Sequence, residues 1–167
     1  SGLELLSLDD VPPYDEAPDT GATFEENALA KARDGFAATG IPTLADDSGL
    51  AVDALNGMPG VLSARWAGGH GDDAANYSLL LAQLGDVPDG RRAAAFVSTC
   101  ALVVGPSDET VVRGEWPGVI ARKPLGDGGF GYDPVFVPVG ESRSAAQLSP
   151  AEKDAASHRG RALALLV

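Results

Sequence analysis

The sequence predicts a single α/β domain built around a mixed β-sheet. The chain has 167 residues, which fits one domain, and 44% of them are hydrophobic, enough for a sizeable core. Its periodic segments follow in the order helix, strand, helix, a run of strands and a last helix. Because the strands come in a run and do not alternate strictly with helices, this order favours a mixed sheet.

Two helices are predicted in the first half of the chain. Residues 23–40, "TFEENALAKARDGFAATG", carry apolar side chains at helical spacing. Thr23 and Glu26 fit a capping box at the start, and Gly40 ends the run. Residues 72–85, "DDAANYSLLLAQLG", predict a second helix with an aspartate N-cap and a glycine just past its end.

Four short segments are predicted to be strands. Residues 41–46, "IPTLAD", are too short and apolar for a helix. Residues 92–105 and 109–116 are rich in β-forming side chains and are joined by "PSD", which predicts an antiparallel pair. Residues 134–139, "PVFVPV", form the last predicted strand. Cys100 lies within the second of these segments, so we interpret it as a core residue.

The closing segment, residues 149–167, predicts a helix that breaks once. Ser149 caps its start as part of a capping box. On one straight helix Lys153 and His158 would diverge by about 140° and would not meet at one ligand. Ser157 is a good N-cap, however, so a restart there would expose the following histidine and arginine at a new helix N-terminus.

Composition and charge exclude several classes of function. The formal net charge is −12, which argues against a non-specific nucleic-acid binder. No apolar run reaches the roughly 20 residues of a membrane span, and the acidic N-terminus lacks the basic start of a signal peptide. The single cysteine excludes an internal disulfide and a multi-cysteine zinc site. We therefore expect a cytoplasmic protein without a membrane or nucleic-acid partner.

A glycine-rich stretch, "GDGGFGYDP" at residues 126–134, matches G-x-G-x-x-G. A strand follows it where the dinucleotide-binding fingerprint requires a helix, so we reject that fingerprint. Phe130 is flanked by glycines and can offer an exposed ring for base stacking. Asp133 precedes a proline, where its carboxylate can accept hydrogen bonds from a base. From spacing alone, an ordinary glycine-rich turn entering a strand is the favoured interpretation.

Two adjacent aspartates, Asp46 and Asp47, stand at the end of the short strand predicted for residues 41–46. With Ser48 and Gly49 behind them, they fit an ordinary turn. They also fit a metal site, because carboxylates at a strand end can bind Mg²⁺ and activate a water molecule. Spacing alone leaves the two interpretations balanced.

Five segments together resemble one family, the inosine-triphosphate pyrophosphatase-like enzymes, which hydrolyse non-standard purine nucleoside triphosphates. The segments, in the family's order, are "TGATFEENALAKA", "ADDSGLAVDALNGMPGVLSARWAG", "GEWPGVI", "GGFGYDPVF" and "LSPAEKDAASHRGRAL". They cover nearly the whole chain, and "ADDSGL", "GFGYDP" and "SHRG" together are a specific combination. The Ala-, Gly- and Asp-rich composition is similar to that of actinobacterial members.

The resemblance implies an ITPase-like fold: a long mixed central sheet flanked by helices, with the active-site cleft between two lobes. It implies that (d)ITP or (d)XTP and water are converted to the nucleoside monophosphate and pyrophosphate. It also implies Mg²⁺ as the cofactor and a homodimer as the assembly.

The resemblance also assigns residues to the site. Asp47 matches the catalytic aspartate, a general base and metal ligand, and Phe130 matches the ring that stacks on the purine. His158 and Arg159 match residues that read the 6-position, where donors favour the oxygen of hypoxanthine or xanthine over the amino group of adenine. The remaining matches to substrate contacts are Ser48, Gly131, Tyr132, Asp133, Lys153 and, in the phosphate channel, Asn27 and Lys31.

The identity of the second acidic metal ligand stays open. In the family it precedes the "TG" before the first helix, and "DEAPDTG" offers both Asp19 and Glu16 there. We prefer Asp19. Asp46 is expected to support Asp47, either beside the metal or as a further ligand of it.

One element of the family is not found in this sequence, either because the chain is a fragment or because the protein lacks it. Members begin with a strand followed by Ser/Thr-x-Asn-x-x-Lys, which binds the triphosphate, and no such motif precedes "TGATFEEN". The first residues, "SGLELLSLDDVPP", are instead similar to the family's next strand. We expect a polypeptide that begins at Ser1 to be unstable and nearly inactive compared with one in which the element is restored.

Three other functions compete with this interpretation. A signalling receiver domain also uses paired aspartates, but it requires five βα repeats where this chain has a run of strands. A non-catalytic nucleotide-binding module would bind ITP without releasing pyrophosphate. A related pyrophosphatase would act on other modified nucleotides, and a panel of substrates would separate it from the first interpretation.

Overall fold

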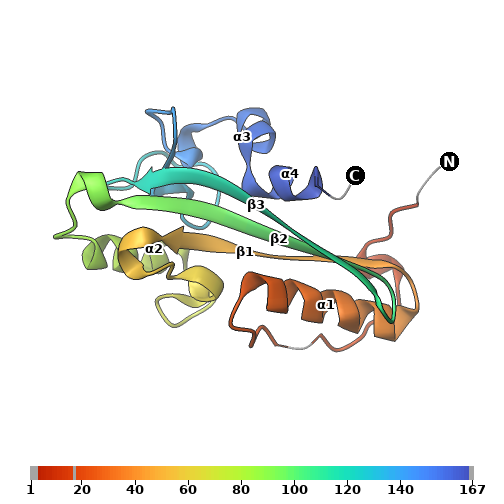
Figure 1. Ribbon diagram of the computed structural model, residues 1–167. Helices are drawn as coiled ribbons and strands as arrows, with labels where there is room; N and C mark the ends of the chain where they lie inside the picture. The colour runs from red at the N-terminus through yellow and green to blue at the C-terminus, as the bar shows by residue number, and fades with distance from the viewer. Residues whose placement is uncertain (1–3, 17, 166–167) are drawn as a thin grey trace.

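Four strands form one antiparallel sheet in the order β1-β2-β3-β4 (Figure 1). The strands are β1 (Thr43–Val52), β2 (Ala93–Gly105), β3 (Asp108–Ile120) and β4 (Phe136–Pro138). This computed structural model describes residues 4–16 and 18–165. The α/β class is confirmed. The predicted mixed sheet is not, because each neighbouring pair of these strands is antiparallel.

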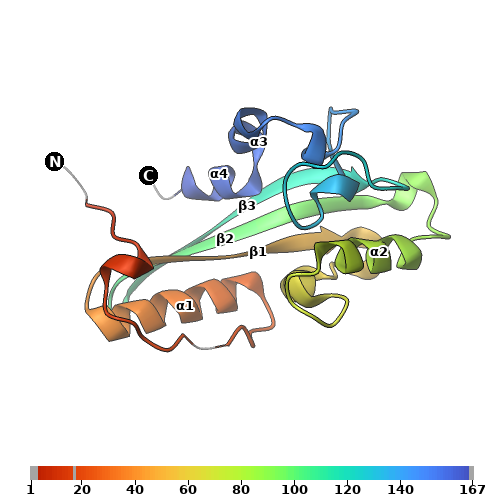
Figure 2. The same cartoon turned by 180° about the vertical axis from the view of Figure 1, so that it is seen from behind.

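Helices cover both faces of the sheet, as Figures 1 and 2 show from opposite sides. The long helix α1 (Phe24–Thr39) lies against one face, on β1 and β2. Two short helices, α3 (Pro150–Ala156) and α4 (His158–Leu163), lie over the opposite face, where α4 packs on β2 and β3. The fourth helix, α2 (Asp73–Gln83), adds apolar side chains to the core next to β1.

Strand β1 is longer than the segment predicted for it. It continues through the two aspartates to Val52, because Asp46 pairs with Cys100 and Asp47 pairs with Thr99 on β2. The prediction that the aspartates follow the end of a strand is therefore wrong, and so is the alternative of a turn. Both carboxylates project from the middle of a paired strand.

Helix α1 has the predicted ends. The Thr23 hydroxyl accepts a hydrogen bond from the backbone N–H of Glu26 at 3.2 Å, and Gly40 closes the helix in the left-handed conformation at φ 69°. The Glu26 carboxylate accepts from the backbone N–H of Ala22 at 2.6 Å, one residue before the position that a capping box would use.

The main core packs the sheet against α2 and the segments that follow β3. Phe96 on β2 contacts Phe136 with ring centroids 4.5 Å apart, and Trp116 on β3 lies 5.6 Å from Phe136. Leu50 and Val52 of β1 belong to the same buried cluster. Cys100 is a buried free thiol, which confirms its interpretation as a core residue.

The closing helix breaks at Ser157, as predicted. The Ser157 hydroxyl accepts from the backbone N–H of Gly160 at 3.2 Å and so caps α4 directly after α3 ends. Gly114 on β3 lets α4 approach closely, because a Cβ there would lie 2.5 Å from the backbone nitrogen of Ala162. A glycine on the sheet thus places the start of α4, with His158, directly on the strands.

Two further predictions of strands, for residues 134–139 and for the first 13 residues, differ from the structure. Residues 133–135 form a 3₁₀ turn, so β4 is shorter than the predicted strand. Within residues 4–13 the structure has a 3₁₀ turn, Leu8–Asp10, and no strand, while residues 1–3 lie outside the described part. Among the described helices, none has both the length and the apolar character that crossing a membrane requires.

Candidate functional site

A partly buried group of three charged residues and one asparagine joins α1 to β1. Oδ2 of Asp47 accepts a hydrogen bond from the Asn27 amide at 3.0 Å, and its Oδ1 lies 3.4 Å from the Lys31 ammonium. Asp19, in the segment before α1, places its Oδ1 3.0 Å from the same ammonium. We call Asp19, Asn27, Lys31 and Asp47 the carboxylate cluster.

The cluster follows from helix and strand geometry. Asn27 and Lys31 are four residues apart, so both project from the same face of α1 toward β1. Asn27 is only 2% exposed, and its Oδ1 accepts from the backbone N–H of Gly21 at 2.7 Å. Because both ends of this amide are bonded within the protein, Asn27 fixes the orientation of Asp47. The structure does not expose it as part of a channel.

Burial and charge act against each other on Asp47. Burial raises the pKa of its carboxyl above the ordinary value, while the hydrogen bond from Asn27 and the charge of Lys31 oppose that rise. For Lys31 burial disfavours the charged form, but Asp19 and Asp47 outweigh it and the pKa of the ammonium is raised. Lys31 is therefore a stable cation, and Asp47 has the raised basicity that suits a proton acceptor.

Asp46 faces the opposite side of the sheet, because successive side chains of a strand alternate. Its Oδ2 accepts from the Ser48 hydroxyl at 3.1 Å and from the Arg159 guanidinium at 3.1 Å. Its backbone carbonyl, however, accepts from Lys31 at 3.4 Å. Asp46 thus lies outside the carboxylate cluster but is bonded to both sides of the sheet. The structure does not bring its carboxylate together with Asp47 and Asp19.

A second group of residues surrounds the ring of Phe130. This ring is 66% exposed, and the Lys153 ammonium lies 4.3 Å from its centroid. Lys153 also forms an ion pair with Asp133, which is buried and accepts from the backbone N–H of Phe130 at 2.9 Å. Together with His158 and Arg159 from α4, we call these residues the aromatic pocket.

Contacts from distant segments hold the loop that carries Phe130. The backbone N–H of Gly131 donates to the carboxylate of Asp73 at 2.7 Å, and the Tyr132 hydroxyl donates to the carbonyl of Ser63 at 2.7 Å. Tyr132 lies in the core, so the structure uses it to anchor the loop. Asp73 and Ser63 were not found from the sequence. The available signal was the double aspartate at the start of α2, where Asp72 serves as the N-cap and Asp73 is the first helical residue.

His158 is wedged between the sheet and the pocket. Its ring stacks on Phe96 with centroids 5.2 Å apart, and its Nδ1 is buried without a hydrogen-bond partner in the described structure. Burial lowers the pKa of His158 to about 4, and the positive charges of Arg159 and Lys153 add to the lowering. The imidazole is therefore neutral at physiological pH, so one of its two ring nitrogens carries a proton and can donate a hydrogen bond, while the other can accept one.

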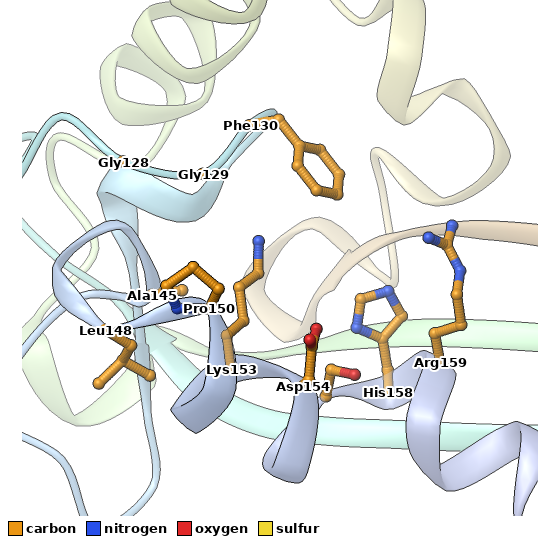
Figure 3. Close-up of a pocket in the computed structure, with 11 residues that line it drawn as sticks. Gly128, Gly129, Phe130, Ala145, Leu148, Pro150, Lys153, Asp154, His158 and Arg159 are labelled. Atoms are coloured by element: carbon orange, nitrogen blue, oxygen red, sulfur yellow. The ribbon is translucent and has the colours of Figure 1, made fainter.

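The aromatic pocket encloses a cavity of about 390 Å³. Figure 3 shows Lys153 pointing toward the Phe130 ring, with the side chains of His158 and Arg159 beside it. The backbone of Gly128 and Gly129 forms another part of the wall. A flat ring, two cations and a neutral imidazole around a space of this size can bind a planar ligand that carries hydrogen-bond acceptors.

The donor set of the carboxylate cluster fits a magnesium ion that is shared with a ligand. In the described residues no group of three or more His, Cys, Asp and Glu side chains is placed to hold a metal ion. Asp19 and Asp47 nevertheless converge on one cation, the Lys31 ammonium. Mg²⁺ takes oxygen ligands, and one or two carboxylates suffice when phosphate oxygens complete its shell. Between the open alternatives, Asp19 is the residue that shares Lys31 with Asp47.

Known proteins resemble the chain over its whole length. The model of the Ham1 family matches residues 1–167. A dITP/XTP pyrophosphatase of Nocardia farcinica is 78% identical over 98% of this chain and 79% of its own length. One of Mycobacterium tuberculosis strain H37Rv is 76% identical over 100% of this chain and 81% of its own length. The predicted likeness to actinobacterial proteins is confirmed.

Solved structures give the same result. The crystal structure of a nucleoside-triphosphatase / dITP/XTP pyrophosphatase from Mycobacterium abscessus is 68% identical, with a TM-score of 0.88 over 100% of this chain and 85% of that chain. The Ham1 protein of Staphylococcus aureus is 41% identical and also has a TM-score of 0.88, over 95% of this chain and 81% of that chain. The chain therefore belongs to the Ham1 family.

Proposed function

We propose that the protein hydrolyses non-standard purine nucleoside triphosphates, dITP/ITP and XTP/dXTP, to the nucleoside monophosphate and pyrophosphate. The observation that carries this proposal is the position of Asp46 between the two groups. Its carboxylate accepts a hydrogen bond from Arg159, and its backbone carbonyl accepts one from Lys31. The aromatic pocket and the carboxylate cluster adjoin at one residue of β1, which supports a base site and a phosphate site for the same ligand. Relatives at 78% and 76% identity that are named dITP/XTP pyrophosphatase support the same activity.

The aromatic pocket supplies the recognition of the base. A purine stacks on the exposed ring of Phe130, a contact of about 1–3 kcal/mol. Lys153 and Arg159 are donors only, and neutral His158 can donate through one ring nitrogen. These donors pair with a 6-oxo group, whereas the 6-amino group of adenine leaves them unsatisfied at a cost of about 1–3 kcal/mol.

The carboxylate cluster supplies the chemistry. Asp47 accepts a proton from a water molecule as the water oxygen bonds to the α-phosphorus. The bond from that phosphorus to the oxygen bridging to the β-phosphorus then breaks, and pyrophosphate leaves. When bound, Mg²⁺ held by Asp47 and Asp19 neutralises phosphate charge. Its fit with the two carboxylates supports the choice of this metal.

Three residues take more specific places in this proposal. Ser48 lies on the same face of β1 as Asp46 and bonds to it, which supports contact with the substrate between the two groups. Asn27 is buried and bonded at both ends, which supports positioning of Asp47 in place of the predicted contact with phosphate. Asp46 is assigned to the connection with Arg159 and not to the metal.

The single domain and the homodimer remain predictions. Light scattering coupled to size-exclusion chromatography of the purified protein tests the assembly, and a mass of one chain would contradict the dimer. A single cooperative unfolding transition is expected for a single domain.

The function is tested by pyrophosphate release from dITP, XTP, dATP and dGTP, with Mg²⁺ and with a chelator, by a polypeptide in which the N-terminal Ser/Thr-x-Asn-x-x-Lys element is restored. We expect turnover of dITP and XTP, far lower turnover of dATP, and no turnover without the metal. Equal rates for all four nucleotides would contradict the argument from hydrogen bonding. Binding of ITP without pyrophosphate release would instead identify a non-catalytic nucleotide-binding module.

A further inference from the structure

The Lys31 ammonium occupies the point at which the two carboxylates of the cluster converge. We propose that Lys31 is a built-in counter-cation, which holds Asp19 and Asp47 together in the resting protein, competes with the divalent cation for them, and is released toward the nucleotide phosphates when that cation binds. The inference rests on the proposed function, because it assumes that this cluster takes the metal.

The first support is the number of contacts that Lys31 makes. An ammonium has three donors, and the structure gives this one three oxygen partners: Asp19 Oδ1 at 3.0 Å, Asp47 Oδ1 at 3.4 Å and the Asp46 carbonyl at 3.4 Å. All three donors are thus directed at the protein. In this arrangement Lys31 cannot bind a phosphate oxygen without giving up at least one of these contacts.

The second support is the charge of the cluster. The side chains of Asp47, Lys31 and Asp19 are 13%, 23% and 35% exposed, so water screens Asp47 weakly and Asp19 only in part. Without a cation between them, Asp19 and Asp47 would repel each other. Lys31 provides that cation. Its attraction to Asp19 and Asp47 outweighs the effect of burial and raises the pKa of its ammonium. A divalent cation would provide the same neutralisation more strongly and would make the contacts of Lys31 redundant.

The third support is the contrast between Lys31 and Asn27 on the same helix. Asn27 is buried and bonded at both ends, so Asp47 keeps its orientation when Lys31 departs. Lys31 has a long, flexible side chain and is bonded only through its tip. The cluster therefore combines a fixed partner for the carboxylate with a displaceable one, and displacement frees two of the three donors of Lys31 for a phosphate.

The test is Mn²⁺ binding in the absence of nucleotide, measured by electron paramagnetic resonance of free Mn²⁺. Lys31→Met removes the competing charge, so we expect it to bind Mn²⁺ roughly tenfold more tightly than wild type. Lys31→Arg keeps the charge and is expected to bind like wild type. Lys123→Met is the matched control, because Lys123 is exposed in a loop and its loss changes the net charge equally.

Thermal unfolding provides a second measurement that needs no turnover. Lys31→Met leaves two carboxylates without a partner, so its Tm is expected to fall without metal and to rise with Mg²⁺ by more than that of wild type. Pyrophosphate release by the same variant is expected to fall at least tenfold, because the phosphates lose a cation. Tighter metal binding and slower turnover in one variant distinguish competition from simple damage.

Two results would overturn the inference: equal or weaker Mn²⁺ binding by Lys31→Met, or a gain that Lys123→Met reproduces. Failure of the proposed function has a different signature. In that case the wild type with the N-terminal element restored releases no pyrophosphate from dITP under any metal condition, whatever the affinities of the variants for Mn²⁺.

Discussion

The carboxylate cluster and the aromatic pocket are built in opposite ways. The cluster rests on the long helix α1 and the paired strand β1, and its anchor Asn27 is buried and fully bonded. The pocket rests on a glycine-rich loop and two short helices, and its central ring, Phe130, is exposed (Figure 3). Groups that act on a bond need fixed positions, whereas a surface that admits a base needs to be open before the base arrives.

This contrast leads to different expectations for variants of the two groups. Damage to the cluster should reduce the rate of the chemical step and leave nucleotide binding largely intact. Damage to the pocket should weaken binding and change the choice of base. Variants that break one group, or the connection between them, measure how far the two are separate.

Apart from replacement of Asp47 itself, the largest effect is expected for Asn27→Ala. Asp47 loses the donor that orients it, and a contact of this kind at an active-site carboxylate is worth roughly 10- to 100-fold in kcat. The KM for dITP should change less than threefold. Asn76→Ala is the matched control, because Asn76 is equally buried and bonds the backbone of Ala67 and Ala64 outside both groups. A similar loss of kcat in both variants would assign Asn27 a purely structural role.

Phe130→Ala should have the next largest effect, on binding. Removing the stacking surface should raise the KM for dITP by roughly tenfold, from a loss of about 1–3 kcal/mol. Because the ring is exposed, the free energy of unfolding should stay within about 0.5 kcal/mol of wild type. Steady-state kinetics and urea denaturation test the two statements. An unchanged KM would remove Phe130 from base recognition.

The pH dependence of stability should reveal the buried imidazole of His158. Its pKa of about 4 in the folded protein lies below the unfolded value of 6.5, so the unfolded chain binds the proton first as the pH falls. The protein should therefore lose roughly 3 kcal/mol of stability from this group between pH 7 and pH 4. Urea denaturation of wild type and His158→Gln isolates the contribution, since the variant lacks it. Parallel pH profiles would contradict the buried, neutral state.

The smallest effect is expected for Asp46→Asn. The ion pair of Asp46 with Arg159 is partly exposed, and pairs of this kind contribute about 0–1 kcal/mol. Turnover of dITP and the Mg²⁺ concentration for half-maximal rate should each change less than threefold. An increase of tenfold or more in that Mg²⁺ concentration would show that Asp46 is a metal ligand after all.

The ends of the helices were predictable because the contacts that form them are local. Thr23, Ser149 and Ser157 each accept from a backbone N–H three residues ahead, and such spacing is visible in a sequence. The extent of β1 was not predictable in the same way. It depends on pairing with β2, some 50 residues away, which places Asp46 and Asp47 on opposite faces of a strand.

The site was predictable where a short motif carries several of its residues. The aromatic pocket draws on two such motifs, "GFGYDP" and "SHRG". Its supports were not predictable: Asp73 and Ser63 hold the loop from more than 50 residues away, and Gly114 makes room for α4. The preference for Asp19 over Glu16 gains support from the fold, because Asp19 meets Lys31 in space.

The most direct measurement compares binding and turnover of dITP in wild type and Asp47→Asn. Calorimetric titration gives the affinity for dITP, and pyrophosphate release gives the rate. If the carboxylate cluster performs the chemistry and the aromatic pocket the recognition, Asp47→Asn binds dITP within about fivefold of wild type and releases pyrophosphate at least about 1,000-fold more slowly. Undiminished release by the variant would contradict the assignment of Asp47 and, with it, the division between the two groups.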